Sequence, residues 1–294
     1  MSAPTAQGPP EQPSALGLLS AVRLTRPRNC MLTGVSVWVG AVTSGHPHMT
    51  IEVALAALGA GAIAGAGNSM NDVIDLEIDQ HNRPDRPLPS GQLAVGVALA
   101  VAALLGVVGL CLAFLAGLVP GMIAFVVVTG LALYNWWLKR TGLAGNVLVS
   151  LIAASTFAYG AAAAGNWGRW WIPALFAACY HAGRELIKGF EDTRGDELLN
   201  IRSVARVHGD RAACRSAALL LGLVALAAPL PTCFGIYSWG YLATVLALDA
   251  FLVGIVFRLW SGLSVGAPRL SPRLLIGMGL GLAAIVAGEL LDRA

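Results

Sequence analysis

Long apolar segments alternate with short polar ones along the whole chain. A helix that crosses a membrane needs about 20 mostly apolar residues, and we find nine segments of roughly that length. The pattern therefore predicts an all-α polytopic membrane protein. The expected helices cover residues 17–43, 51–73, 93–116, 120–138, 143–164, 170–189, 211–231, 236–258 and 273–291.

The composition agrees with this pattern and excludes an ordinary soluble domain. Charged residues make up 12% of the chain, whereas soluble domains carry about 25%. The 35 glycines allow helices to approach closely, which favours a compact bundle. Residues 1–14 are rich in Pro, Ala, Ser and Gln, so we expect a disordered tail ahead of one transmembrane domain over 15–294. No nucleic-acid partner is expected.

The basic residues indicate how the protein is oriented. With nine spans, only Arg169 and Arg293 of the 19 Lys and Arg residues fall on one side. Because basic loops stay in the cytoplasm, the amino terminus and the charged loops are predicted to be cytoplasmic and the carboxyl terminus external. Function is therefore expected at the cytoplasmic face of the inner (cytoplasmic) membrane.

A first acidic cluster, "NDVIDLEID", follows the second apolar segment. Residues four apart lie on one face of a helix, so Asn71, Asp75 and Asp79 would form one stripe if the helix continues. Asn68 and Asp72 would lie on an adjoining stripe. An acidic helix end is often only a solvated cap, and that interpretation would suffice for one cluster alone.

A second cluster, "DTRGD", follows the sixth apolar segment on the same predicted side. Here Asp192 and Asp196 repeat the four-residue spacing. Carboxylates gathered in a partly dry site need cations to remain charged. Mg²⁺ prefers hard oxygen ligands and substrate phosphates, so the two clusters together predict Mg²⁺ ions that bridge to a diphosphate. Basic residues that would cover further phosphate charge are Arg83, Arg86, Lys139, Lys188 and Arg194.

These motifs resemble those of the UbiA superfamily of intramembrane prenyltransferases. "NDVIDLEID" with its sequel "NRPDRPLPSG" is similar to the first signature, and "DTRGD" is similar to the second. "YNWWLKRTGLAGN" resembles the family's stretch after the fourth helix. "RLTRPRNCMLTGVSVWVGA" and "RELIKGFEDTRGD" are similar to the digeranylgeranylglyceryl phosphate synthase branch. The resemblance covers most of the chain.

The resemblance implies a nine-helix bundle around a central cavity with cytoplasmic cap loops. It also implies Mg²⁺-dependent transfer of a polyprenyl group from its diphosphate, in this branch a geranylgeranyl group to geranylgeranylglyceryl phosphate for lipid biosynthesis. The expected catalytic residues are Asp75, Asp79, Asp192 and Asp196. The expected metal ligands are these four with Asn71 and Asp72, and the expected diphosphate-binding residues are Arg83, Arg86, Lys139 and Lys188.

Further residues are candidates for the cavity and the acceptor. Aromatic faces would stabilise an allylic cation, although an interfacial belt or ordinary packing explains the tryptophans equally simply. The cavity candidates are Asn68, Tyr134, Asn146 and Tyr159, with Trp136, Trp137 and Phe157 as additional aromatics. The acceptor candidates are Arg26 and Asn29, at the start of the first apolar segment.

The sequence also departs from the family pattern. Relatives often have Lys-Asp before the second signature, where this chain has Lys188 and Gly189. The later Thr-Leu-Pro of many relatives is replaced by Ser203-Val204-Ala205. These changes bear on substrate identity more than on the class of reaction.

Other functions stay open at this point. The same chemistry could act on an aromatic acceptor, such as a quinone precursor, or on a tetrapyrrole. An ion-coupled transporter would also place carboxylates in membrane helices, and a non-catalytic lipid-binding relative would keep the fold alone. Asp249, inside the eighth apolar segment, is an intramembrane carboxylate for which the sequence indicates no partner.

Overall fold

The computed structural model describes residues 15–192, 201–262 and 269–291, and within these ranges the chain is helical with no β-strand. The tail at 1–14, Arg194, Asp196 and Arg293 therefore lie outside the described residues. The helices are α1 (Ala15–Leu24), α2 (Pro27–Thr43), α3 (Ile51–Ile74), α4 (Leu76–Asn82), α5 (Val95–Ala116), α6 (Leu118–Trp136), η1 (Leu138–Thr141), α7 (Leu143–Ala163), α8 (Trp171–Glu191), α10 (Val204–His208), α11 (Asp210–Ala227), α12 (Leu230–Cys233), α13 (Trp239–Ser261) and α14 (Leu274–Leu291).

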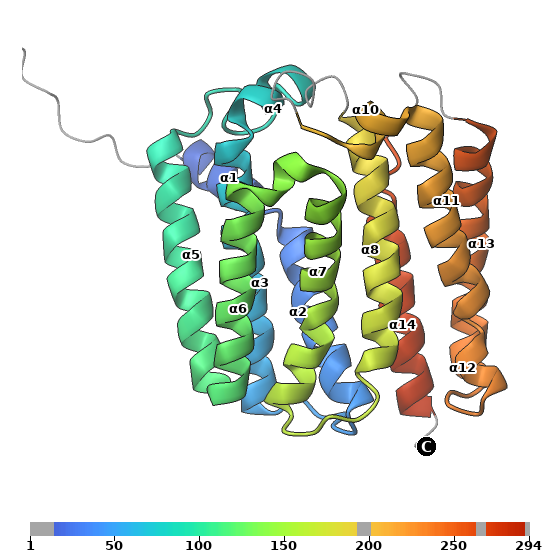
Figure 1. The fold of residues 1–294 in the computed structure, drawn as a ribbon. Helices are drawn as coiled ribbons and strands as arrows, with labels where there is room; N and C mark the ends of the chain where they lie inside the picture. Colours follow the sequence, from blue (N-terminus) through green and yellow to red (C-terminus); the bar gives the residue numbers. More distant parts are fainter. Residues whose placement is uncertain (1–14, 193–200, 263–268, 292–294) are drawn as a thin grey trace, which may run out of the picture.

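The long helices stand side by side in one bundle (Figure 1). α2 packs against α3, α7 and α14, and α8 packs against α7, α11 and α14. The short helices α1, α4 and α10 lie together at one end of the bundle, while the carboxyl end of α14 lies at the other. The acidic segments are thus gathered at a single end.

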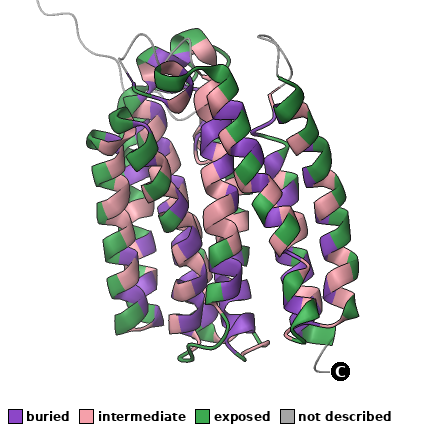
Figure 2. Ribbon diagram, turned by 45° about the vertical axis from the view of Figure 1, so that its right-hand side comes forward, coloured by how far each residue is buried: buried purple, intermediate pink, exposed green. Residues whose placement is uncertain are grey.

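Within the described ranges, seven of the predicted spans are long and apolar enough to cross a membrane. They are α3, α5, α6, α7, α11 with α12, α13 and α14. Large apolar side chains such as Leu104, Val126 and Phe257 are exposed, and exposed residues recur along the long helices (Figure 2). A bundle with such a surface is an integral membrane protein. α2 is shorter, with 17 residues, and α8 carries charged residues near its end, so nine spans remain a prediction.

The expected helix over 17–43 is wrong at its beginning, because the chain breaks between α1 and α2. Arg26 has a φ of 55°, in the left-handed region, and Pro27 follows it at the start of α2. Proline has no backbone N–H to donate, so it suits the first turn of a helix and not the interior. The expected helix over 211–231 is likewise interrupted around Pro229, between α11 and α12.

Two glycines allow α2 and α7 to cross in direct backbone contact. A Cβ atom added to Gly160 would lie 1.8 Å from the carbonyl oxygen of Val37, and one added to Gly40 would lie 2.2 Å from that of Phe157. Neither carbonyl can retreat without moving its helix. The crossing therefore requires glycine at both positions.

Replacing Gly160 by Ala is expected to destabilise the protein by about 1–3 kcal/mol, because overpacking forces the two helices apart. Thermal unfolding of the purified protein would measure the loss. Gly222→Ala is the matched control, since Gly222 is also helical and no atom lies within 4 Å of an added Cβ. Equal stability of the two variants would contradict the tight crossing.

An ion pair joins elements at the end opposite the acidic segments. Glu289 of α14 is 1% exposed and accepts a hydrogen bond from Arg169, with an N to O distance of 3.1 Å. Arg169 also donates to the carbonyl of Ile236 at 2.8 Å, and its guanidinium lies over the ring of Tyr237. Glu289 is therefore a buried structural residue of this end of the bundle.

Candidate functional site

The first acidic motif lies on an almost continuous helix. α3 ends at Ile74, and Asp75 joins it to α4. The backbone N–H of Asp75 donates to the carbonyl of Asn71 at 2.9 Å, and that of Asp79 donates to the carbonyl of Asp75 at 2.7 Å. Because helical hydrogen bonds persist through the junction, Asn71, Asp75 and Asp79 keep the common face that their spacing predicts.

This face opens on a cavity of about 100 Å³ at the acidic end of the bundle, hereafter the upper chamber. Residues of both acidic motifs line it, so the structure brings the two motifs together. Asp72 does not line the chamber, and Asp196 lies outside the described residues. The predicted site residues in the lining are Arg26, Asn71, Asp75, Asp79, Arg83, Arg86, Tyr134, Lys139, Asn146, Lys188 and Asp192.

Every described aspartate of the two motifs contacts a basic residue. Lys139, from η1, pairs with both carboxylate oxygens of Asp75, and its Nζ lies 3.2 Å from the Asn71 side-chain oxygen. The Asn71 amide also donates to Asp75 at 2.8 Å. Asp192 accepts from Arg83 at 2.7 Å and pairs with Arg269 at 3.3 Å.

Arg86 connects the two faces of the first motif. It pairs with Asp79, and its Nη1 lies 3.2 Å from Asp72, which also pairs with Arg26. Burial raises the pKa of Asp79, and Arg86 offsets part of that effect. Burial alone would lower the pKa of Arg83, but the Asp192 carboxylate raises it above its usual value. The buried carboxylates of the chamber are thus stabilised by the basic residues that pair with them.

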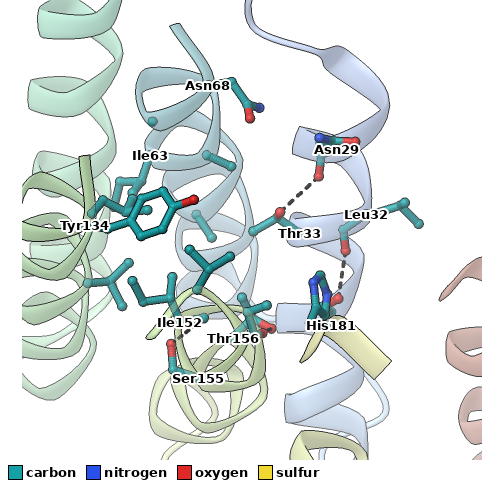
Figure 3. Close-up of a pocket in the computed structure, with 18 of the residues that line it drawn as sticks. Asn29, Leu32, Thr33, Ile63, Asn68, Tyr134, Ile152, Ser155, Thr156 and His181 are labelled. Atoms are coloured by element: carbon teal, nitrogen blue, oxygen red, sulfur yellow. Dashed lines mark hydrogen bonds between the residues drawn. The ribbon is translucent and has the colours of Figure 1, made fainter. Parts of the chain in front are cut away.

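A second cavity of about 260 Å³ extends from the upper chamber into the bundle and is called here the deep cavity (Figure 3). Side chains of α2, α3, α6, α7, α8 and α14 line it. Among the sequence candidates, Asn29, Asn68 and Tyr159 line this cavity only. The two cavities share the lining residues Arg26, Asn71, Tyr134, Glu185 and Lys188.

The wall of the deep cavity carries both apolar and polar side chains. In Figure 3, Asn29 and Asn68 lie toward one end, Tyr134 projects between the helices, and Ile152 lies toward the other end with Ser155 and Thr156. A smaller cavity of about 80 Å³ adjoins it and shares the lining residues Ser36, Ala153, His181 and Met278. Together the cavities can enclose a long apolar chain with its polar end in the upper chamber.

Three aromatic candidates from the sequence do not line the deep cavity. Trp136 and Trp137 are 84% and 62% exposed, so they belong to the outer surface. Phe157 is buried and lines only the smaller cavity. The helix periodicity around residue 134 can direct only one side of α6 inward, and Tyr134 occupies that side.

Arg184 and His181 were not among the predicted site residues, although both line the deep cavity. His181, Arg184 and Lys188 follow one another at helical spacing, which places them on one face of α8. This spacing could have indicated them from the sequence. Asp249 lines none of these cavities, and its Oδ1 is buried without a hydrogen-bond partner.

The two departures from the family pattern lie next to each other. An added Cβ on Gly189 would lie 3.4 Å from the Cβ of Ser203, and both residues line the upper chamber. The hydroxyl oxygen of Ser203 is buried and has no hydrogen-bond partner. This chain therefore has a small, neutral wall at the place where relatives often have an aspartate.

The donor atoms of the upper chamber suit a hard divalent cation. Asn71, Asp75, Asp79 and Asp192 supply only oxygen atoms, as Mg²⁺ prefers, and a bound diphosphate would supply more. Among the described residues, no three His, Cys, Asp or Glu side chains are close enough to hold a metal by themselves. The residues present therefore fit Mg²⁺ that shares its ligands with a phosphorylated substrate.

The chain is similar to known proteins over most of its length. A model of the UbiA prenyltransferase family matches residues 32–286. A digeranylgeranylglyceryl phosphate synthase of Sulfolobus acidocaldarius is 35% identical over 236 residues, which cover 80% of this chain and 86% of that protein. A solved structure from work on digeranylgeranylglyceryl phosphate synthase in membranes aligns with a TM-score of 0.69 and 26% identity, over 94% of this chain and 99% of that one. A UbiA homologue from Archaeoglobus fulgidus bound to GPP and Mg²⁺ aligns with a TM-score of 0.67 and 14% identity, over 92% and 98% of the two chains.

Proposed function

The chain belongs to the UbiA prenyltransferase family, and from that premise we propose that it transfers a geranylgeranyl group from its diphosphate to geranylgeranylglyceryl phosphate. One observation carries the proposal: an acidic and basic chamber opens directly into a cavity with a mainly apolar wall, through shared lining residues. The two parts match the two ends of a prenyl diphosphate. The similarity to digeranylgeranylglyceryl phosphate synthases supports the choice of acceptor.

Mg²⁺ is proposed as the cofactor, because the oxygen donors of the upper chamber suit it and a structural relative is bound to Mg²⁺. When bound, Mg²⁺ neutralises charge on a departing diphosphate. Asp72 lies outside the chamber lining, where it pairs with Arg26 and Arg86, and it would have to exchange these contacts to act as a metal ligand. The proposed ligands are Asn71, Asp72, Asp75, Asp79, Asp192 and Asp196, with Asp75, Asp79, Asp192 and Asp196 as the catalytic residues.

The basic residues of the chamber are proposed to bind the diphosphate. Arg83 has a buried Nε with no hydrogen-bond partner, so this donor is available to a phosphate oxygen. Arg86, Lys139 and Lys188 line the same chamber. Phosphate oxygens would replace some of their present carboxylate contacts, which keeps the charges compensated while the C–O bond to the diphosphate breaks.

The allylic cation formed by that step must be kept from water. The deep cavity would enclose the apolar chain, with the rings of Tyr134 and Tyr159 in its wall. Aromatic faces attract cations, so these rings would stabilise the allylic carbon. The acceptor hydroxyl oxygen then forms the new C–O bond to the allylic carbon, and its proton passes to the departed diphosphate. Asn68 lines the deep cavity and Asn146 lines the upper chamber, so both border the space in which the proposed reaction takes place.

The acceptor is proposed to bind near Arg26 and Asn29, which line the deep cavity at the start of α2. Arg26 is held in the left-handed backbone region, and such strain is concentrated at functional sites. Arg23 and Arg28 are exposed and line neither cavity. An aromatic or tetrapyrrole acceptor is the second candidate, with the same donor chemistry.

The proposed orientation places the amino terminus and the upper chamber at the cytoplasmic face. The basic residues that precede and follow the long helices support it, because α1, α4 and α10 lie at the same end of the bundle (Figure 1). The carboxyl end of α14 would then face the exterior.

The purified protein, incubated with labelled geranylgeranyl diphosphate and Mg²⁺, is expected to prenylate geranylgeranylglyceryl phosphate. Thin-layer chromatography of the extracted lipid would detect the product, and excess EDTA should abolish its formation. Hydroxybenzoate, a quinone precursor and a tetrapyrrole alcohol serve as the comparison acceptors. Transfer to one of these but not to the glycerophosphate would overturn the proposed acceptor and leave the chemistry in place.

A further inference from the structure

A buried charge cluster on α8 lies where the upper chamber meets the deep cavity. Glu185 is 5% exposed and accepts hydrogen bonds from two basic neighbours on its own helix. Its Oε1 lies 3.1 Å from Arg184 Nη1, and its Oε2 lies 2.7 Å from Lys188 Nζ. All three residues line the deep cavity, and Glu185 and Lys188 also line the upper chamber.

The charge of the deep cavity wall is not balanced within the described residues. Glu185 is the only acidic residue in that wall, whereas Arg26, Arg184 and Lys188 are all basic. Arg26 pairs with Asp72, but Glu185 remains shared between two cations. Charged side chains are costly inside a membrane protein unless they are paired or used. The excess of positive charge therefore favours an anionic ligand in this part of the cavity.

Arg184 also has an unused hydrogen-bond donor. Its Nε is buried and has no partner, while one of its terminal nitrogens is engaged by Glu185. Buried donors are almost always satisfied, so an exception indicates a missing acceptor group. A guanidinium offers its donors in a planar fork that matches two oxygens of a phosphate. Glu185 holds this fork in place against the cavity wall.

We propose that Arg184, positioned by Glu185, binds the phosphate of the glycerophosphate acceptor, with Arg26 contributing from the break between α1 and α2. This inference rests on the proposed function and names the group that recognises the acceptor's charged end. The place is consistent with the reaction, because Glu185 and Lys188 stand where the two cavities meet. An acceptor held there would present its hydroxyl below the diphosphate, where the new C–O bond must form.

Arg184→Gln is expected to raise the KM of geranylgeranylglyceryl phosphate roughly tenfold or more, since a hydrogen bond to a charged group is lost. The KM of the prenyl diphosphate should change by less than about twofold, because that substrate binds in the upper chamber. The decisive measurement uses two acceptors, geranylgeranylglyceryl phosphate and its phosphate-free alcohol. Wild-type protein should prefer the phosphate, and the variant should lose most of that preference.

Arg184→Lys keeps the charge but loses the fork, so it should retain an intermediate preference. Glu185→Gln tests positioning and should weaken the preference for the phosphate. Arg215→Gln is the matched control, because Arg215 is an exposed arginine of α11 that lines none of the cavities. Circular dichroism and thermal unfolding would verify that each variant is folded.

The outcomes separate this inference from the proposed function. Unaltered preference for the phosphate in folded Arg184→Gln and Arg184→Lys would overturn the role of Arg184, while prenyl transfer itself continued. Absence of transfer to either glycerol acceptor in the wild-type protein would remove the proposed function and this binding site with it. A loss of preference confined to the α8 variants would establish the site.

Discussion

Replacement of Asp75 by Asn, or of Asp192 by Asn, is expected to lower kcat for prenyl transfer by roughly a hundredfold to a thousandfold. Both carboxylates line the upper chamber, and they come from helices that are far apart in the sequence. Asn keeps the size of the side chain but removes the charge that would bind Mg²⁺. Each substitution should therefore affect the departure of the diphosphate and not the enclosure of the prenyl chain.

Initial rates at saturating geranylgeranyl diphosphate, measured over a range of Mg²⁺ concentrations, would check this expectation. The Mg²⁺ requirement should rise in both variants. Glu77→Gln is the control, because Glu77 belongs to the same motif but is exposed and does not line the chamber. Full activity in folded Asp75→Asn or Asp192→Asn protein would remove the metal-assisted mechanism.

Lys139→Met is expected to lower kcat by about a hundredfold, since one cation that faces the diphosphate is lost. The structure predicts an opposite effect on the metal. Lys139 contacts both oxygens of Asp75 and the side-chain oxygen of Asn71, so it competes with a metal ion for these donors. Its removal should lower the Mg²⁺ concentration that gives half-maximal activity, even as the maximal rate falls.

Mg²⁺ titrations of the reaction rate would measure both effects in one experiment. Arg140→Met is the matched control, because Arg140 is the next residue, is exposed and does not line the chamber. If Lys139→Met required more Mg²⁺ and kept its kcat, Lys139 would instead organise the metal ligands. The combination of a lower rate and a lower Mg²⁺ requirement distinguishes contact with the diphosphate from support of the metal.

The long helices could be predicted from hydrophobic patterning because most of them are apolar along their whole length. Hydrophobic patterning did not reveal the break at Arg26, because a proline in the first turn of a helix changes neither the hydropathy of the segment nor its length. It also did not reveal the crossing at Gly40 and Gly160, where the need for glycine depends on the backbone of a helix distant in the sequence. Close contact between two helices that are distant in the sequence leaves no recognisable pattern in the residues around each glycine.

The candidate site was predictable where function uses a regular spacing. The stripe of Asn71, Asp75 and Asp79 follows from helical geometry, and the structure brings it to Asp192. The ion partners of each aspartate were not predictable, because Arg86 and Lys139 reach their carboxylates through the folded arrangement of separate segments. The role of the pair of Arg184 and Glu185 was also not predictable, because it depends on the cavity that these two residues line.

The exposed tryptophans set the depth of the protein in the bilayer. Trp136 and Trp137 lie next to η1, at the chamber end, while Trp171 begins α8 at the opposite end and is also exposed. α7, one of the seven described helices able to span a membrane, has 21 residues and is thus about 31 Å long, close to the thickness of a hydrocarbon core. Indole rings prefer the level of lipid headgroups, so the chamber stands at that level. A lipid substrate can therefore enter with its phosphate remaining among the headgroups and its tail never leaving the hydrocarbon.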